Sequence, residues 1–498
     1  MDAAAPTTSV KNRLIKGFAW FAAARIIVNL LTFASSIILA RLLMPEDFGL
    51  VALATGLNAV IVALTQLPIA EALIQTDNLE DDHFHSAFTL GLARGVMLCV
   101  VLLIITWPAA AIYNDTRLIP ILLLMALNAL ISGFYSARWP LMQKHLSFKP
   151  AFVMEAASRI TSFLVAIPIA YFYRSYWAIV IPITVLQLLS VIITYLYAPY
   201  RPRLSTRRVR DIWSFSVWVT LSSMLNTINL RIDTLLIGAL LGQRAVGYYS
   251  YGDDKAALPS REIGGSMIHL LFPGLTLVKD DPQRLISGFK RIQSLMFAIC
   301  APAGVGLALV ADDFVLGFLG GKWAPIIPII QVIAVALAFE NLIIPVRPLA
   351  MAMGQTRALF RRDVLTFACR TPAIIIGLLM FGIEGVLAAR TLSMLVGVGL
   401  FLTLARDVAH VPVRDQLAGS SRSIAALGAM TLGLLAFKEL AAFEAMSHLA
   451  ALLTSIALGG ALYVMSHAAI WHLAGRPDGP EREVSSILQG FARRRARQ

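Results

Sequence analysis

The chain has 498 residues, of which 58% are hydrophobic and only 14% are charged, whereas ordinary soluble domains carry about 25% charged residues. Apolar runs recur along the whole chain, and many reach the roughly 20 residues that a helix needs to cross a bilayer. This composition excludes a soluble globular protein and predicts an all-α, polytopic membrane protein. The meaning of its net charge of +13 depends on where the charged residues lie relative to the membrane-spanning helices.

Hydropathy and turn residues, taken in chain order, predict fourteen membrane-spanning helices. The first apolar run follows a polar, basic segment, but it is too long for the core of a signal peptide and contains Arg25. We therefore predict an uncleaved first span. The fourteen predicted ranges are 17–40, 48–70, 86–112, 118–137, 155–172, 176–198, 212–240, 246–271, 289–311, 325–350, 364–380, 384–404, 423–437 and 447–470.

Lysine and arginine residues are distributed unevenly between the two ends of these spans. When Lys290 and Arg291 at the start of the ninth span are counted with the loop before it, the side that carries the N-terminus holds 27 of the 42. The opposite side holds 6, and 9 lie inside the spans. Because basic residues in short loops stay in the cytoplasm, we predict that both termini are cytoplasmic. The positive charge is then a topology signal and an attraction to anionic lipid headgroups, so no nucleic-acid partner is expected.

The loops on the side opposite the termini are all short. A membrane enzyme that polymerises or ligates glycans usually needs a large external loop to hold its active site, so this class is disfavoured. The sequence offers no catalytic constellation of nucleophile and base, and no G-x-x-x-x-G-K-[ST] phosphate loop. We therefore predict that the protein is not an enzyme and hydrolyses no nucleotide.

Two stretches of the sequence, ARLLMPEDFGLVALA at 40–54 and GALLGQRAVGYYSYG at 238–252, match at leucine and glycine positions with a constant offset of 198 residues. The offset spans six predicted helices, so the repeat is parallel and predicts two pseudo-symmetric six-helix lobes with a site at their interface. The expected divisions are residues 1–200, residues 201–405, and a third segment, 406–498, with two further helices and a basic cytoplasmic tail.

Polar residues mark one face of two spans that the repeat pairs. In the first span Arg25 and Asn29 lie one turn apart, and in the seventh Arg231 and Asp233 follow several serine, threonine and asparagine residues. Such a stripe either joins helices through hydrogen bonds or lines a polar cavity. We expect these four residues to contribute to substrate binding.

The eighth span carries an unusual density of charge in GYYSYGDDKAALPSREIGG, residues 247–265. A charged side chain at the centre of a spanning helix costs about 2.5–3.5 kcal/mol, so these residues are expected to face water or one another. Asp254, Lys255 and Arg261 are either members of structural ion pairs or part of the wall of a transport cavity, and the two roles are compatible. We expect Arg261 to contact the substrate, Asp254 to hold it when the site is empty, and Pro259 to loosen the helix.

Five stretches of the sequence carry a family pattern. They are ILARLLMPEDFGLVALA at 38–54, LMQKHLSFKPAFVMEAAS at 141–158, LGQRAVGYYSYGDDKAALP at 241–259, LLFPGLTLVKDDPQRL at 270–285 and FVLGFLGGKWAPIIPIIQVIA at 314–334. Together they resemble bacterial polysaccharide flippases of the Wzx-like, polysaccharide-transporter type within the MOP superfamily. The resemblance extends over roughly residues 10–410.

This resemblance implies a two-lobed transporter of the bacterial inner membrane that works by alternating access. It would flip an undecaprenyl-diphosphate-linked oligosaccharide from the cytoplasmic to the periplasmic leaflet, for exopolysaccharide, capsule or O-antigen synthesis. It implies as partners the lipid-linked oligosaccharide, membrane lipids, a glycan polymerase and a chain-length regulator. In related peptidoglycan lipid II flippases, cationic residues on helices one, two and eight are important, and Arg25, Lys255 and Arg261 correspond by helix. Helix two here has no lysine or arginine between Phe48 and Ala70, which departs from that pattern.

The multidrug-extrusion branch of the same superfamily is an alternative, because its small-molecule and cation antiporters share the fold. Carboxylates in a cavity favour cation extrusion, whereas cations favour phosphate transport, and the predicted spans contain both. No cofactor or metal is expected: Cys99, Cys300 and Cys369 are scattered in apolar runs, and the DDHFHS cluster with His83 and His85 on one short loop is typical of a solvated turn.

Overall fold

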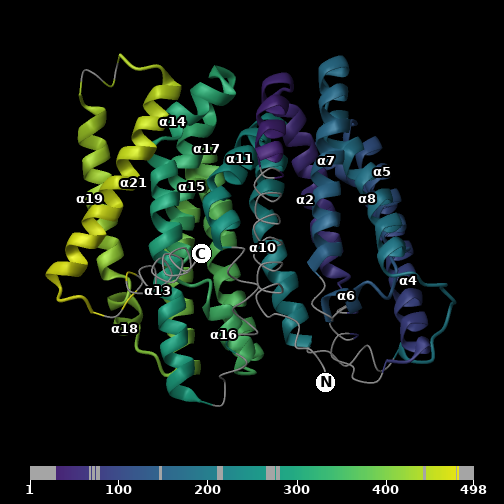
Figure 1. The fold of residues 1–498 in the computed structure, drawn as a ribbon. Helices are drawn as coiled ribbons and strands as arrows, with labels where there is room; N and C mark the ends of the chain where they lie inside the picture. Colours follow the sequence, from purple (N-terminus) through teal and green to yellow (C-terminus); the bar gives the residue numbers. More distant parts are fainter. Residues whose placement is uncertain are drawn as a thin grey trace, which may run out of the picture. The chain divides into compact units, whose positions relative to one another are not determined.

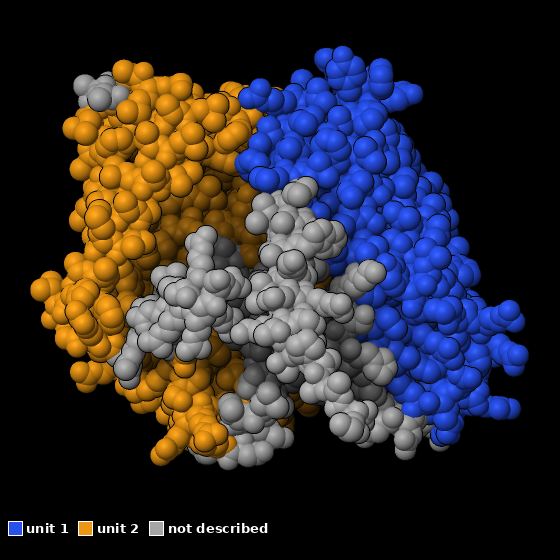
Figure 2. Space-filling view, viewed as in Figure 1, with its two compact units in different colours: residues 1–215 blue, residues 216–498 orange. Residues whose placement is uncertain are grey.

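All regular secondary structure that the computed structural model describes is helical (Figure 1). The described residues are 28, 30–66, 69, 73, 79–144, 148–209, 217–264, 275, 281–440, 443, 445–477, 479 and 481. The chain divides into two compact units, unit 1 with residues 1–215 and unit 2 with residues 216–498, which Figure 2 distinguishes by colour.

Unit 1 has a helix at each of the first six predicted spans. Its helices are Leu30–Leu42, α2 (Pro45–Leu64), α4 (Asp81–Ile112), α5 (Leu118–Ser132), α6 (Pro140–Lys144), α7 (Phe148–Tyr173) and α8 (Trp177–Tyr197). α4 packs along α5, and α7 packs along α8. A Cβ added to Gly95 of α4 would lie 3.0 Å from the carbonyl oxygen of Ala129 and 3.1 Å from Cα of Gly133. Small residues therefore let α4 and α5 approach closely.

Unit 2 has a helix at each of the other eight predicted spans. Its elements are α10 (Val217–Leu241), α11 (Gln243–Ala256), η1 (Ser260–Gly264), α13 (Pro282–Leu309), α14 (Ala311–Phe314), η2 (Val315–Leu319), η3 (Gly321–Ile326), α15 (Ile327–Glu340), α16 (Val346–Ala352), α17 (Thr356–Ala409), α18 (Val413–Ala418), α19 (Ser421–Lys438) and α21 (His448–Leu473). α13 packs along α15, α10 along α17, and α19 along α21. The α13–α15 contact again uses a glycine, since a Cβ on Gly304 would lie 3.0 Å from the carbonyl oxygen of Ala334.

α17 joins the eleventh and twelfth predicted spans through a reversal at Gly382. A straight helix of its 54 residues would be about 80 Å long, far longer than the roughly 30 Å core of a bilayer. Gly382 instead has a φ of 61° and a ψ of −137°, which favours glycine, and the backbones of Gly377 and Gly385 touch beside it. The two arms run back along each other, because Arg362 on one pairs with Asp407 on the other.

The tenth predicted span, 325–350, is interrupted between α15 and α16. Pro345 lies in the break and has no N–H for a helical hydrogen bond. The side chain of buried Asn341 donates to carbonyl groups of its own helix, and Gln293 of α13 donates to the carbonyl of Leu342 at 2.8 Å. Neighbouring side chains therefore satisfy backbone groups that the break releases, as a helix break inside a membrane requires.

Nine helices in the described part of the chain are long and apolar enough to cross a membrane, and two shorter apolar helices are Leu30–Leu42 and Leu118–Ser132. Large apolar side chains such as Phe172 and Leu473 are exposed on helix surfaces, where lipid would cover them. The protein is therefore an all-α multipass membrane protein. That the chain crosses the membrane fourteen times stays a prediction.

Candidate functional site

The charged stretch of the eighth predicted span lies where α11 ends. The regular helix stops at Ala256, three residues before Pro259, and the π-helical turn η1 follows. Proline interrupts the helical hydrogen-bond pattern because it lacks an N–H, and π-helical turns occur frequently at functional sites. Residues 265–270 lie outside the described part of the chain.

Asp254 joins the two cations of this stretch. Its carboxylate accepts hydrogen bonds from Nη1 of Arg261 at 2.7 Å and from Nζ of Lys255 at 2.9 Å. Lys255 is buried with Nζ 4.6 Å from the ring centroid of Tyr251, whereas Arg261 is half exposed and also lies 3.6 Å from Glu262. The predicted pairing of Asp254 with Arg261 is therefore present, and Arg261 is the accessible cation of this cluster.

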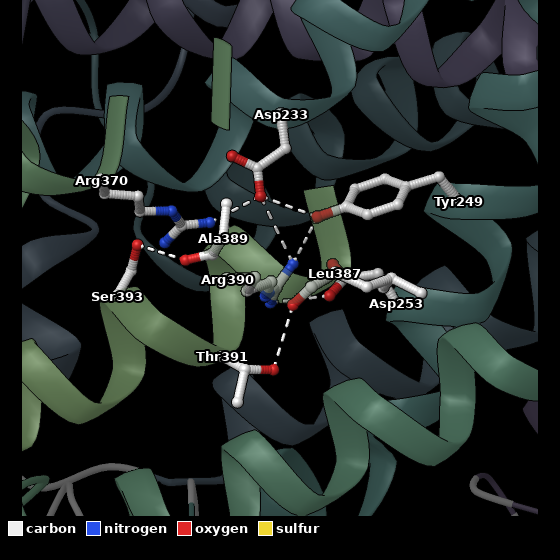
Figure 3. A network of polar contacts seen from close by, with 9 residues as sticks. All are labelled: Asp233, Tyr249, Asp253, Arg370, Leu387, Ala389, Arg390, Thr391 and Ser393. Atoms are coloured by element: carbon white, nitrogen blue, oxygen red, sulfur yellow. Dashed lines mark hydrogen bonds and ion pairs between the residues drawn. The ribbon is translucent and has the colours of Figure 1, made fainter. Parts of the chain in front are cut away.

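A second and more deeply buried cluster joins α10, α11 and α17 (Figure 3). Asp233, only 1% exposed, accepts hydrogen bonds from Nη2 of Arg370 at 2.6 Å and from the Tyr249 hydroxyl at 2.7 Å. Arg390 donates to the Tyr249 oxygen at 2.8 Å and pairs with Oδ1 of Asp253 at 2.8 Å. Charge-assisted hydrogen bonds are the stronger class, so this cluster fastens the three helices to one another.

The buried cluster also holds the two arms of α17 at one level. Arg370 lies on the first arm and Arg390 on the second, and both lie within 3.6 Å of Asp233. Glu340, the last residue of α15, interacts electrostatically with both guanidinium groups. Removing one partner of a buried ion pair leaves an uncompensated charge, so we assign this cluster a bracing role. Arg370, Arg390 and Tyr249 all contact the same carboxylate oxygen of Asp233, Oδ2.

Of the predicted site residues, Asp254, Lys255 and Arg261 lie together at the end of α11, whereas Arg25 and Asn29 lie outside the described residues.

The remaining two predicted site residues, Arg231 and Asp233, lie in different environments. Asp233 is buried in the brace, whereas Arg231 is exposed on α10 and pairs with no carboxylate in the described part of the chain. Arg370 and Arg390 are not among the predicted site residues, although each lies inside a predicted span. Their charge inside a spanning helix was the signal that could have identified these two arginines as candidates. Their partner, Asp233, lies too far away in sequence to be inferred from spacing.

The DDHFHS cluster is not the predicted solvated turn, because its six residues form the start of α4 and His83 is buried. Its side chains pair with later segments of unit 1: Asp81 with Arg138, Asp82 with Arg207, and His85 with Tyr200. Burial raises the pKa of the Tyr200 hydroxyl to about 12, so it stays protonated at neutral pH. No group of three or more potential metal ligands occurs among the residues that the structure describes.

Comparison with known proteins finds relatives of this chain. A family model for polysaccharide biosynthesis proteins matches residues 38–328. The lipopolysaccharide biosynthesis protein WzxC of Escherichia coli is 26% identical over 382 residues, which cover 76% of this chain and 78% of WzxC.

Two solved structures share the fold. The lipid II flippase MurJ in an inward closed conformation gives a TM-score of 0.73 at 15% identity, covering 92% of this chain and 100% of MurJ. An inward-facing MATE-family multidrug resistance transporter of the MOP superfamily gives a TM-score of 0.59 at 15% identity, covering 77% of this chain and 95% of the transporter. Because flippase and multidrug transporter both match, the fold alone does not distinguish these functions.

Proposed function

Because the chain belongs to the polysaccharide biosynthesis protein family of Wzx-like flippases, we propose that it flips an undecaprenyl-diphosphate-linked oligosaccharide from the cytoplasmic to the periplasmic leaflet. It is a multipass membrane transporter of polysaccharide biosynthesis and not an enzyme. The family match over residues 38–328 carries the proposal. The substrate class, the direction and an alternating-access mechanism for exopolysaccharide, capsule or O-antigen synthesis are its proposed details.

The cations at the end of α11 support an anionic substrate. A diphosphate offers many acceptor oxygens, and a guanidinium presents a planar fork of donors that fits such a group. Half-exposed Arg261 is therefore the proposed phosphate contact, with Asp254 as its partner when no substrate is bound. Buried Lys255 keeps positive charge beside them. Arg25 keeps the role proposed for it from the sequence.

A cation antiporter is less well supported. Such a transporter would need a carboxylate that a cationic substrate can reach. The most buried carboxylate of the described spans, Asp233, is already paired with Arg370 and lies 3.6 Å from Arg390. The charge of this carboxylate is therefore already compensated by two guanidinium groups.

Complementation tests the proposed function. A strain that lacks its own flippase, and that makes a defined lipid-linked repeat unit, accumulates this intermediate in the inner leaflet. Expression of the chain should restore surface glycan. Expression at normal membrane levels without restored glycan, tried with several repeat units, would contradict the proposal.

A further inference from the structure

Unit 1 contains a mostly apolar pocket of about 260 Å³, and none of the residues named in the proposed function lines it. Three helices line it: Leu30–Leu42, α7 and α8. The first contributes Thr32, Ser35 and Ser36, which lie at positions i, i+3 and i+4 and therefore share one helical face.

The other two helices contribute a cation and an apolar wall. α7 adds Ser158, Arg159 and Ser162, while α8 adds apolar residues that include Pro182 and Ile183. Serine and threonine residues of two helices and one arginine thus share the lining of the pocket with apolar residues of α8. Ligand pockets commonly combine a mostly apolar lining with a few converging polar groups.

Arg159 differs in its ion pairing from two arginines in the helices of unit 2. Arg347 pairs with Asp363 at 2.7 Å, and Arg370 pairs with Asp233 at 2.6 Å. Arg159 has no ion-pair partner among the residues that the structure describes, although Glu155 lies one turn earlier on α7. A charged side chain within a spanning segment is costly unless polar groups surround it, and the pocket supplies those groups.

We infer that this pocket is a subsite for one oxyanion-bearing group of the lipid-linked saccharide. The subsite rests on the proposed function, since a flippase has to accommodate the whole headgroup of its substrate. The guanidinium of Arg159 binds the oxyanion through paired donors. Serine hydroxyls both donate and accept, so they complete the shell around an anion or a neighbouring sugar hydroxyl.

The size of the pocket restricts what enters it. Sites for drug-sized ligands occupy about 300–1,000 Å³, so a pocket of about 260 Å³ admits one small group and not an oligosaccharide. The oxyanion comes either from the diphosphate of the carrier or from the carboxylate of one acidic sugar. Both present oxyanion oxygens, and the carboxylate also brings ring hydroxyls.

Binding to the purified full-length protein in detergent tests the subsite. The probes are a polyprenyl diphosphate without sugar, sodium glucuronate, and glucose as the neutral counterpart. Arg159→Gln should weaken binding of one anionic probe at least about tenfold, because the charged, paired hydrogen bonds are lost. Arg159→Lys should bind with intermediate affinity, since it keeps the charge without the planar fork.

Three matched variants separate the pocket from general effects. Arg201→Gln removes one exposed charge from the same unit, and Ile160→Ala changes the exposed neighbour of Arg159. Glu155→Gln tests whether Arg159 acts only through an ion pair along α7. All three should bind the probes like the unmodified protein. If Arg159→Gln fails to reach the membrane, the double substitution Ser158→Ala and Ser162→Ala removes pocket hydroxyls at unchanged charge and should weaken the same probe.

The outcomes distinguish a carrier diphosphate from an acidic sugar as the source of the oxyanion. They also distinguish failure of the subsite from failure of the proposed function. Loss confined to the diphosphate probe assigns the subsite to the carrier, whereas loss confined to glucuronate assigns it to an acidic sugar. The inference is overturned if neither anionic probe binds better than glucose. It is also overturned if Arg159→Gln binds normally, or if Glu155→Gln reproduces the loss. Failure of the unmodified chain to restore glycan export would instead count against the proposed function.

Discussion

At the end of α11, one carboxylate is shared between a buried lysine and a half-exposed arginine. The difference in exposure assigns them different roles. Lys255 is enclosed with Tyr251 and fixes the position of Asp254. Arg261 keeps an accessible side, so an incoming diphosphate can compete with Asp254 for its donors.

Export of glycan should depend on Arg261 and on the shape of its side chain. Arg261→Ala should lower export at least about tenfold, because a hydrogen bond to a charged group contributes about 1.5–3 kcal/mol. Arg261→Lys should retain part of the activity, and Asp254→Ala should be milder, since it frees the cation without removing it. The assay is complementation with membrane levels checked by immunoblot.

The matched control for this series is Arg284→Ala, which removes an arginine whose side chain is 78% exposed and should leave export unchanged. Full export by a stable Arg261→Ala protein would mean that the pair with Asp254 is structural only.

Asp233 should be important for stability more than for substrate contact. Asp233→Ala leaves Arg370 without its buried partner, and breaking a buried pair in this way costs about 3–5 kcal/mol. Thermal unfolding in detergent should therefore show a clearly lower Tm than for Arg231→Ala, which changes an exposed residue on the same helix. Equal Tm values for the two variants would contradict the bracing role of the cluster.

The two charge clusters also show what sequence can predict about a site. Asp254 and Arg261 are seven residues apart, so helical periodicity places them on one face and predicts their contact. Asp233 and Arg370 are 137 residues apart. Their contact depends on the packing of α10 against α17, which no local pattern specifies.

Among the helices, α17 shows most directly how a few particular residues determine the path of the backbone. Hydropathy predicts two spans at 364–380 and 384–404, and the structure forms them as two arms of one hairpin. The reversal requires a positive φ at Gly382 and contact between the backbones of Gly377 and Gly385. Only residues without a Cβ allow that contact.

Gly385→Ala should therefore disrupt the hairpin. Its Cβ would overlap the backbone of Gly377, and a backbone in a packed turn cannot move aside as a flexible side chain can. We expect a large loss of folded protein, measured as the monodisperse fraction after extraction in detergent. Gly399→Ala is the matched control, because a Cβ at this position of the same element meets nothing within 4 Å. It should be neutral or stabilising by about 0.5–1 kcal/mol. Equal yields of the two variants would contradict this reading.

The two units use related packing at corresponding helices. α2 begins at Pro45 and α11 begins at Gln243, which is the offset of 198 residues found in the sequence. Gly95 meets Ala129 in unit 1, and Gly304 meets Ala334 in unit 2. The internal repeat could be found from the sequence at the helix starts, whereas the glycine contacts could not, because they depend on which helices pack together.

At the scale of the whole chain, orientation in the membrane follows from the basic residues and not from the fold. We propose fourteen spans with both termini in the cytoplasm and with the divisions 1–200, 201–405 and 406–498. Reporter fusions test this topology. They should be periplasmic after residues 115, 243 and 322, and cytoplasmic after residues 145, 205, 357 and 498. One reversed fusion among the first twelve spans would contradict the parallel repeat.

Reconstituted transport tests the central claim most directly. The purified chain is placed in liposomes with an undecaprenyl-diphosphate-linked oligosaccharide, and the fraction of glycan exposed to an external, membrane-impermeant enzyme is followed over time without ATP. The chain should expose the glycan faster than protein-free liposomes do, and Arg261→Ala at equal density should remain near the protein-free rate. Transport at the protein-free rate by correctly folded, unmodified chain, or equal transport by Arg261→Ala, would contradict a flippase that holds its diphosphate through Arg261.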